Sequence, residues 1–160
     1  PHYESDPLYI DALVNSINKK INEISWKPDL IIASYHGIPK KYFDKGDPYH
    51  CYCHKTTRLI SEKFSSIKIK TTFQSRFGPQ EWLQPYTDKT LENLPKEGVK
   101  NVLTICPGFA SDCVETLEEI QIQAKESFLN SGGENFDMVP CLNDNSDHII
   151  LLKSLIERNI

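Results

Sequence analysis

Two short segments of the sequence hold the side chains best suited to chemistry. Residues 34–39 place His36 at the end of an apolar run, and residues 111–119 place several carboxylates at the start of an expected helix. A histidine can accept a proton near neutral pH, and carboxylates bind hard or borderline cations. If both segments face one crevice, they supply groups that remove protons from a ligand and bind a metal ion.

A helical projection of residues 112–129 separates acidic from apolar side chains. With Glu115 as the reference direction, Asp112 falls at about 60° and Glu119 at about 40°. The opposite, core-facing side is expected to hold Val114, Leu117, Ile120, Ala124 and Phe128. The alternative interpretation is a solvated helix face whose first turns carry acids because the helix dipole favours them there.

His36 and Trp82 each have a structural and a functional interpretation. A histidine after a strand is often a satisfied structural side chain, but the binding edge of a parallel sheet favours a functional one. Trp82 stands among polar and proline residues. It is a candidate wall for a flat apolar ligand, although a loop tryptophan can also pack locally.

The cysteines give a weaker signal. Cys51 and Cys53 are flanked by His50 and His54, but the gap of one residue is not the spacing of a zinc site. Reduced thiols that pack at a helix start are the favoured interpretation. Cys113 could line the acidic segment, although a buried, inert thiol is favoured there as well.

Composition restricts the class of protein. The 160 residues fit one domain with its own core, and the net charge of −4 disfavours nucleic acid as a partner. No apolar run reaches the roughly 18 to 20 residues of a membrane span, and no signal peptide is evident. Five cysteines, an odd number, favour a reduced, cytoplasmic setting. Because the chain begins at Pro1 and its only methionine is Met138, we expect a fragment that lacks part of any active site.

Apolar spacing predicts alternating helices and strands. Helices are expected over residues 7–24, 51–64, 87–94, 112–129 and 146–157, strands over 30–34, 67–73, 101–106 and 136–139, and irregular loops over 37–50 and 74–85. This alternation predicts an α/β three-layer sandwich, in which a roughly four-stranded parallel sheet has helices on both faces. Because ligands bind outside the carboxyl ends of such strands, His36, the 74–85 loop and the acidic segment are expected at one edge.

Five motifs occur in a characteristic order. They are SYHGIP at 34–39, GDPY at 46–49, FQSRFG at 73–78, WLQPYTD at 82–88 and CPGFASDCVETLEE at 106–119. Together they resemble the C-terminal half of the ferrochelatase family, in its proteobacterial type. These enzymes insert ferrous iron into protoporphyrin IX to make haem. The resemblance covers nearly the whole chain.

The resemblance implies a fold and a catalytic pair. Residues 1–160 would form a single α/β domain, one Rossmann-like lobe of a two-lobed chelatase whose N-terminal lobe is absent here. The family's motif histidine and glutamate face each other across the porphyrin and correspond to His36 and Glu115. The resemblance also implies metal ligation by His36, Glu115, Asp112 and Glu119, which together would pass Fe²⁺ toward the porphyrin.

The resemblance further implies which residues contact the porphyrin, namely Tyr35, Gln74, Arg76 and Trp82. Other members have a histidine where this chain has Cys113, so no ligand role is assigned there. Some members hold a [2Fe-2S] cluster, often through a cysteine-rich C-terminal tail that this sequence lacks. We therefore expect no cluster and no tightly bound cofactor, with Fe²⁺ and protoporphyrin IX as substrates.

His36 is assigned to proton abstraction or metal delivery, and Glu115 is assigned to the other of these two tasks. The sequence does not determine which residue performs which task. The isolated chain is expected to have little or no activity because half the cleft is missing. One alternative is a non-catalytic lobe that binds a tetrapyrrole or a metal, and another is a cobalt or nickel chelatase of the same fold. Peripheral contact with a membrane would suit poorly soluble haem precursors.

Overall fold

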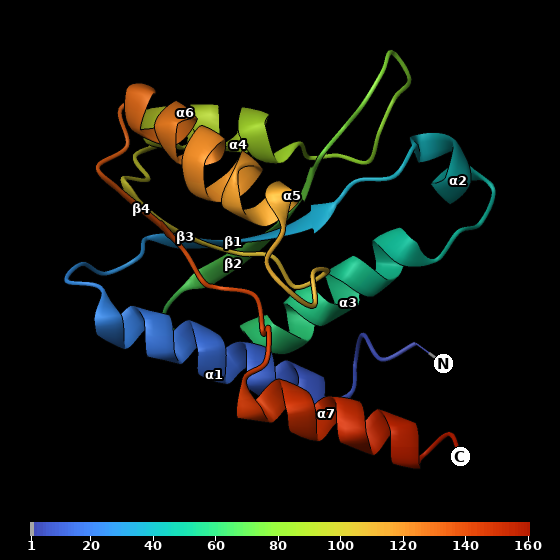
Figure 1. Cartoon of the computed structure of the whole chain (residues 1–160). Coiled ribbons are helices and arrows are strands. Elements are labelled where there is room, and N and C mark those ends of the chain that lie inside the picture. The colour runs from blue at the N-terminus through green and yellow to red at the C-terminus, as the bar shows by residue number, and fades with distance from the viewer. Residues whose placement is uncertain (1) are drawn as a thin grey trace.

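A four-stranded, all-parallel sheet forms the middle layer of the structure, a computed structural model that describes residues 2–160 (Figure 1). Its strands run in the order β2-β1-β3-β4. The strand bounds are β1 Leu30–His36, β2 Lys68–Gln74, β3 Asn101–Ile105 and β4 Asn135–Met138. All neighbouring strands pair in parallel, which confirms the predicted α/β class.

Helices cover both faces of this sheet (Figure 1). One face is covered by α1 Pro7–Glu23, α3 Tyr49–Ser61 and α7 Ser146–Glu157. The other face is covered by α4 Thr87–Asn93 and by a continuous helical segment made of α5 Val114–Leu117, the π-helical η2 Glu119–Ala124 and α6 Lys125–Asn130. Two short elements, α2 Lys40–Asp44 and the 3₁₀ helix η1 Leu94–Glu97, complete the chain.

The continuous apolar run of β1 contributes side chains to two hydrophobic cores, one on each face of the sheet. Ile31 belongs to the cluster under α1, α3 and α7, whereas Ile32 belongs to the cluster under α4 and α6. Successive strand residues point to opposite faces, so a strand covered on both sides needs apolar residues at every position. Only the last residue of β1, His36, is partly exposed.

The helix α1 begins where the sequence predicts it. The Asp6 side chain accepts a hydrogen bond from the Leu8 N–H at 3.0 Å, and Pro7 occupies the first turn, where its missing N–H costs nothing. Its inner face buries Ile10, Leu13 and Ile17 against the sheet. These apolar contacts, which follow helical spacing, fix α1 beneath β1.

Two expectations about helices were wrong. The loop predicted over 37–50 contains α2, and α3 starts at Tyr49 rather than at residue 51. Val114 and Leu117 were placed in the core but are 68% and 50% exposed. A π-helix bonds i to i+5 and turns less per residue, so a projection at 100° per residue loses its register across Glu119–Ala124.

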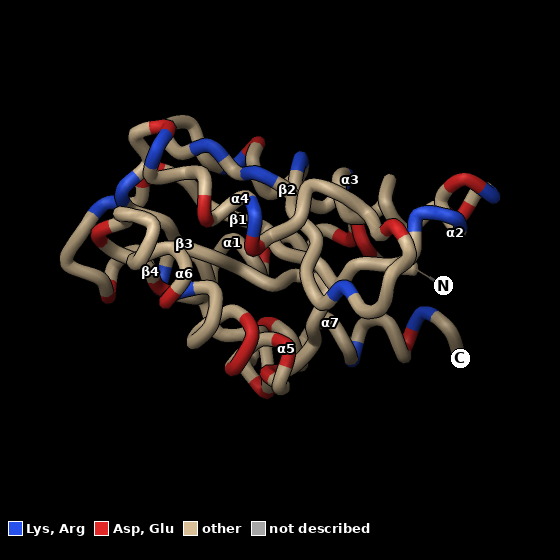
Figure 2. Tube along the Cα trace, turned by 90° about the horizontal axis from the view of Figure 1, so that it is seen from above, with Lys and Arg blue, Asp and Glu red and all other residues tan. Residues whose placement is uncertain are grey.

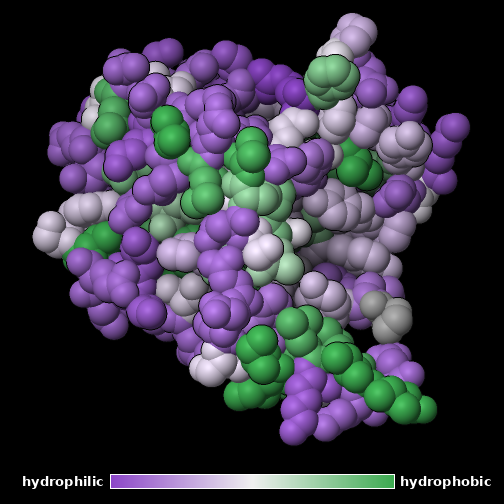
Figure 3. All heavy atoms as spheres, in the orientation of Figure 1, coloured by the Kyte–Doolittle hydropathy of each residue, from purple (hydrophilic) through white to green (hydrophobic). Residues whose placement is uncertain are grey.

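The outer face of α7 is apolar. Figure 3 shows hydrophobic side chains gathered over this helix, at the bottom of the view. The exposed residues are Ile149, Ile150, Leu152 and Ile156. Within residues 2–160, no helix combines the length and the apolar character needed to cross a bilayer.

Candidate active site

The carboxyl ends of the strands bring the sequence-predicted residues to one edge. His36 ends β1, Gln74 ends β2, and residues 106–113 follow β3. The chain passes from β2 across β1 to β3, so the order of strands reverses beside β1. Ligands of open parallel sheets bind at such a switch point. The prediction of a shared edge is therefore confirmed.

His36 is partly exposed, and two hydrogen bonds to backbone carbonyl oxygens fix its position. Its Nδ1 lies 2.7 Å from the Gly37 carbonyl oxygen, and the Tyr49 hydroxyl donates to the His36 carbonyl oxygen at 2.8 Å. A neutral imidazole with its proton on Nδ1 donates to Gly37 and leaves Nε2 as an acceptor. The Phe109 ring lies 6.2 Å away between ring centroids. His36 therefore presents one acceptor nitrogen from a fixed position.

Glu115 lies in the first turn of α5, which begins with a capping box. The Cys113 sulfur accepts from the Thr116 N–H, and the Thr116 hydroxyl oxygen accepts from the Cys113 N–H at 2.9 Å. The pKa of Glu115 is lowered by its own backbone N–H, then by the Cys113 thiol, with a smaller electrostatic contribution from His36. Glu115 is therefore ionised at neutral pH.

Gln74 joins the strands to α5. Its Nε2 donates to the Glu115 carbonyl oxygen at 2.6 Å, and its Oε1 accepts from the Ser34 hydroxyl at 2.7 Å. The side chain is only 4% exposed. Gln74 was expected to contact a porphyrin, but its amide is instead occupied by protein partners.

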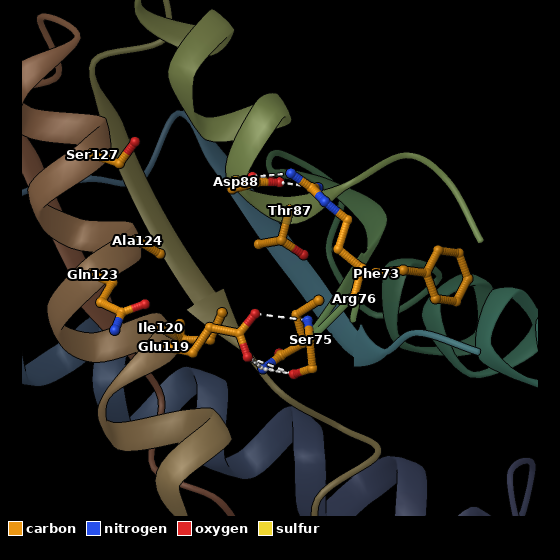
Figure 4. Close-up of a pocket in the computed structure, with 11 residues that line it drawn as sticks. Phe73, Ser75, Arg76, Thr87, Asp88, Glu119, Ile120, Gln123, Ala124 and Ser127 are labelled. Carbon is orange, nitrogen blue, oxygen red and sulfur yellow. Dashed lines mark hydrogen bonds and ion pairs between the residues drawn. The ribbon is translucent and has the colours of Figure 1, made fainter. Parts of the chain in front are cut away.

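Glu119 points toward Ser75, which follows the end of β2 (Figure 4). Its carboxylate accepts from the Ser75 N–H at 2.7 Å, from the Ser75 hydroxyl and from Gln74 Nε2 at 3.3 Å. Ser75 has φ of 63°, a left-handed conformation that is uncommon outside glycine. Together they border a pocket of about 330 Å³, whose lining includes Arg76 and Asp88 but neither His36 nor Glu115.

Asp112 is held by the loop after β4. Its carboxylate accepts from Asn143 Nδ2 at 2.8 Å, the Thr116 hydroxyl at 3.1 Å and the Cys141 N–H at 3.2 Å. Partial burial raises the pKa of Asp112, but these donors outweigh it and leave the pKa below its usual value. This carboxylate fastens the start of α5 to the loop that follows β4.

The acidic stripe expected on one helix face is therefore divided. Figure 2 shows acidic residues gathered around α5, but Asp112 and Glu119 bind different parts of the protein. In the described part of the chain, no three histidine, cysteine, aspartate or glutamate side chains are grouped so that they could hold a metal ion. Metal ligation by all four predicted residues at once is not the arrangement seen.

A family model described as Ferrochelatase matches residues 1–160. The chain belongs to the ferrochelatase family. The ferrochelatase of Rhizobium meliloti (strain 1021) is 56% identical over 162 residues, which cover 100% of this chain and 48% of that protein. Those of Allorhizobium ampelinum and Brucella ovis are 55% and 51% identical, again over 100% of this chain and over 47% and 46% of each relative. The chain thus spans about half the length of the curated relatives it matches, and the predicted proteobacterial type is confirmed.

The three other residues assigned to the porphyrin through the ferrochelatase resemblance lie in different settings. Trp82 forms an isolated bridge with Pro39, and its Nε1 donates to the Phe77 carbonyl oxygen at 2.9 Å, beside the segment that follows His36. Arg76 forms a bidentate ion pair with Asp88, in which each guanidinium N–H···O distance is 2.7 Å.

Tyr35, in contrast, is a core residue. Its side chain is 3% exposed, and its hydroxyl lies 2.9 Å from the Thr57 hydroxyl oxygen. Its neighbours in β1 explain the difference, because Tyr35 points to the face covered by α1, α3 and α7 while His36 points to the face of α5. We therefore leave Tyr35 out of the proposed porphyrin contacts.

His50 and Cys53 of α3 suit a packing role. The His50 ring lies 4.4 Å from that of His54 and stacks on Phe73 at 5.7 Å between centroids. Cys51 is exposed and Cys53 is buried, and burial raises the pKa of the Cys53 thiol to about 12. Burial supports the interpretation of Cys53 as an inert packed thiol, whereas the exposure of Cys51 contradicts the predicted packing for that residue.

Sequence reasoning missed two supporting residues of the site. Ser34 is fully buried in an apolar strand, where its hydroxyl bonds to Gln74 and Thr87. A buried hydroxyl needs hydrogen-bond partners, so a serine inside an apolar run could have pointed to this network. Tyr49, the last residue of the GDPY motif, holds the His36 carbonyl across 13 residues, a contact that the sequence does not reveal.

Proposed function

We propose that this chain is the C-terminal lobe of a two-lobed ferrochelatase that inserts Fe²⁺ into protoporphyrin IX to form protohaem. The observation that carries the proposal is geometric: His36 ends β1, and Glu115, whose carbonyl accepts from Gln74 at the end of β2, lies at the same carboxyl edge of the sheet, in a chain of the ferrochelatase family. A proton acceptor and an anionic metal ligand at one edge are what metal insertion needs.

The reaction exchanges two pyrrole protons for one divalent cation, so charge balances. His36 can accept a pyrrole proton at Nε2, because Nδ1 is directed to the Gly37 carbonyl oxygen. Glu115 can bind Fe²⁺ while the ion sheds water, or accept the other proton. Its partly exposed carboxylate supplies anionic oxygen ligands for a cation, whereas His36 already supplies a proton acceptor at Nε2. We therefore assign proton abstraction to His36 and metal binding to Glu115.

Glu119, Trp82 and Arg76 have supporting parts in the proposal. Glu119 borders the open pocket and can exchange its Ser75 hydrogen bonds for a passing cation. Trp82 offers a flat wall beside the chain that follows His36. The Arg76 guanidinium uses two nitrogens for Asp88 and can offer its remaining donors to a porphyrin carboxylate. Asp112 and Glu119 each have three protein donors, but Glu119 lines the open pocket and Asp112 does not, so Asp112 is left out of the metal path.

The setting of the whole protein is also proposed. Five free cysteines suit a reduced, cytoplasmic compartment. The substrates would be protoporphyrin IX and Fe²⁺, and the second wall of the cleft would come from an N-terminal lobe, since the relatives are about twice as long as this chain. The absence of a [2Fe-2S] cluster and the contact with a membrane surface stay predictions.

The test is metal insertion by the full-length protein under anaerobic conditions. We expect Fe²⁺ to be inserted into protoporphyrin IX faster than Co²⁺ or Ni²⁺ is inserted into any tetrapyrrole tried. A preference for cobalt or nickel would support the rival chelatase, and porphyrin binding without metalation would support the non-catalytic lobe. The isolated chain should turn over little or no porphyrin, and rapid turnover would contradict the two-lobed proposal.

A further inference from the structure

We propose that Gln74 is a positioning residue that fixes Glu115 relative to His36. The chemistry it serves rests on the function proposed above, but the positioning itself is argued from contacts within this chain. Gln74 is the one residue among 2–160 that hydrogen-bonds both to the residue after His36 and to Glu115 itself. It thereby connects the two proposed reactive groups through a single buried side chain.

The first connection runs through the backbone. Gln74 is the register partner of His36 across the β1–β2 pair, and its carbonyl oxygen accepts from the Gly37 N–H at 2.8 Å. This bond extends the ladder one residue beyond His36. The exit direction of the chain after His36, and with it the carbonyl that receives the imidazole, is therefore set by Gln74.

The second connection runs through the side chain. Gln74 Nε2 donates to the Glu115 carbonyl oxygen at 2.6 Å and lies 3.3 Å from a Glu119 carboxylate oxygen. The helix α5 spans only four residues before the π-helical segment. A short helical turn has little stability of its own, so a bond from the sheet to its carbonyl fixes where Glu115 lies.

The orientation of the amide is determined by its partners. The Glu115 carbonyl and the Glu119 carboxylate only accept hydrogen bonds at neutral pH, so the NH₂ group must point toward them. The amide oxygen then faces Ser34, whose hydroxyl donates at 2.7 Å. Glutamate in this place would set a carboxylate against two acceptors, and methionine would keep the shape but lose every bond.

The experiment compares Gln74→Met and Gln74→Glu with Gln121→Met in the full-length protein. Gln121 is a matched control, a glutamine of the π-helical segment η2 whose Nε2 reaches Asp137 at 3.4 Å, away from the site. We expect kcat for Fe²⁺ insertion to fall by about 100-fold in both Gln74 variants, since a misplacement of about 1 Å can cost that much. The KM for protoporphyrin should stay within about threefold, and Gln121→Met should match the wild type.

A purely structural role would lower thermal stability without changing kcat per folded molecule, and that result would overturn the proposal. If the Gln74 variants do not fold, Ser34→Ala removes the hydroxyl that donates to the amide oxygen, together with its bond to Thr87, and its kcat decides in the same way. Crystal structures of the wild type and of Gln74→Met provide a readout independent of activity. The Glu115 carbonyl, having lost the donor at 2.6 Å, should move relative to His36 by about 1 Å, and an unmoved Glu115 would overturn the proposal. If the wild type inserts no metal, the proposed function fails, and this comparison of structures still decides the positioning role.

Discussion

His36 and Gln74 are register partners at the carboxyl ends of two adjacent parallel strands. One presents the imidazole, and the other holds the carbonyl of Glu115 across the sheet edge. Strand register therefore sets the geometry of the proposed catalytic pair. A slip of one residue would turn His36 to the opposite face of the sheet and separate it from α5.

Replacing Gly37 by alanine should disturb this pairing directly. A Cβ at Gly37 would lie 2.9 Å from the Gln74 carbonyl oxygen and 3.3 Å from the Trp82 ring. Because the Gln74 backbone cannot shift easily to relieve this clash, we expect the free energy of unfolding to fall by about 1–3 kcal/mol, measured by urea denaturation. Metal insertion should fall as well. Gly108→Ala is the control, because its new Cβ would meet only ordinary contacts at 3.5 Å and beyond. Equal stability of the two variants would contradict the close packing.

Removing the imidazole should abolish most of the catalysis without unfolding the protein. His36 is partly exposed at a strand end, so His36→Ala leaves no large core cavity. Loss of a general base costs about 10²–10⁴ in kcat. The measurement is steady-state Fe²⁺ insertion, with circular dichroism as the check on folding. His54→Ala removes an exposed histidine of α3 and should leave the rate unchanged. A rate for His36→Ala near that of His54→Ala would exclude the assigned role.

Asp112 should contribute to stability in a pH-dependent way. Asp112→Asn places an amide against the donors of Asn143 and Cys141, which should cost about 1–3 kcal/mol at neutral pH. Because the folded pKa is lowered from 3.8, the wild-type stabilisation is complete above that value and is lost as pH falls through the lower folded pKa. The difference between variant and wild type should therefore shrink in acid. Urea denaturation at pH 7 and below pH 3.8 tests this, and a difference independent of pH would contradict it.

Arg76 should affect porphyrin binding through the porphyrin's carboxylates. Arg76→Ala removes an exposed guanidinium that now pairs with Asp88. If its remaining donors bind a propionate, the KM for protoporphyrin should rise about tenfold, the value of one charge-assisted hydrogen bond. The KM for a porphyrin dimethyl ester should not change. Arg58→Ala, which removes a surface pair with Glu62, is the control. An equal change for acid and ester would contradict this contact.

Local patterns predicted most of the fold because they reflect local causes. The Asp6–Pro7 start of α1 and the apolar run of β1 gave correct elements, and parallel strands then placed His36 at the binding edge. The exposure of Val114 was missed because a π-helical turn depends on packing that the sequence pattern does not reveal.

The hydrogen-bond partners of the site residues could not be predicted from the sequence for a related reason. Asp112 bonds to Asn143, 31 residues away, and Gln74 bonds to Glu115, 41 residues away. Such contacts arise only when the sheet and its covering helices are assembled. This is why Gln74 was assigned to the ligand although its side chain is occupied within the protein.

The central claim is that Glu115, at the same sheet edge as His36, is required for the proposed insertion of Fe²⁺ into protoporphyrin IX by the full-length protein. The most direct measurement is the anaerobic rate of Fe²⁺ insertion by the full-length protein and by its Glu115→Gln variant, with protoporphyrin binding followed by fluorescence. We predict turnover by the wild type and about 1% of that rate or less for the variant, while both bind protoporphyrin equally well. A Glu115→Gln variant that inserts Fe²⁺ at the wild-type rate would contradict the claim.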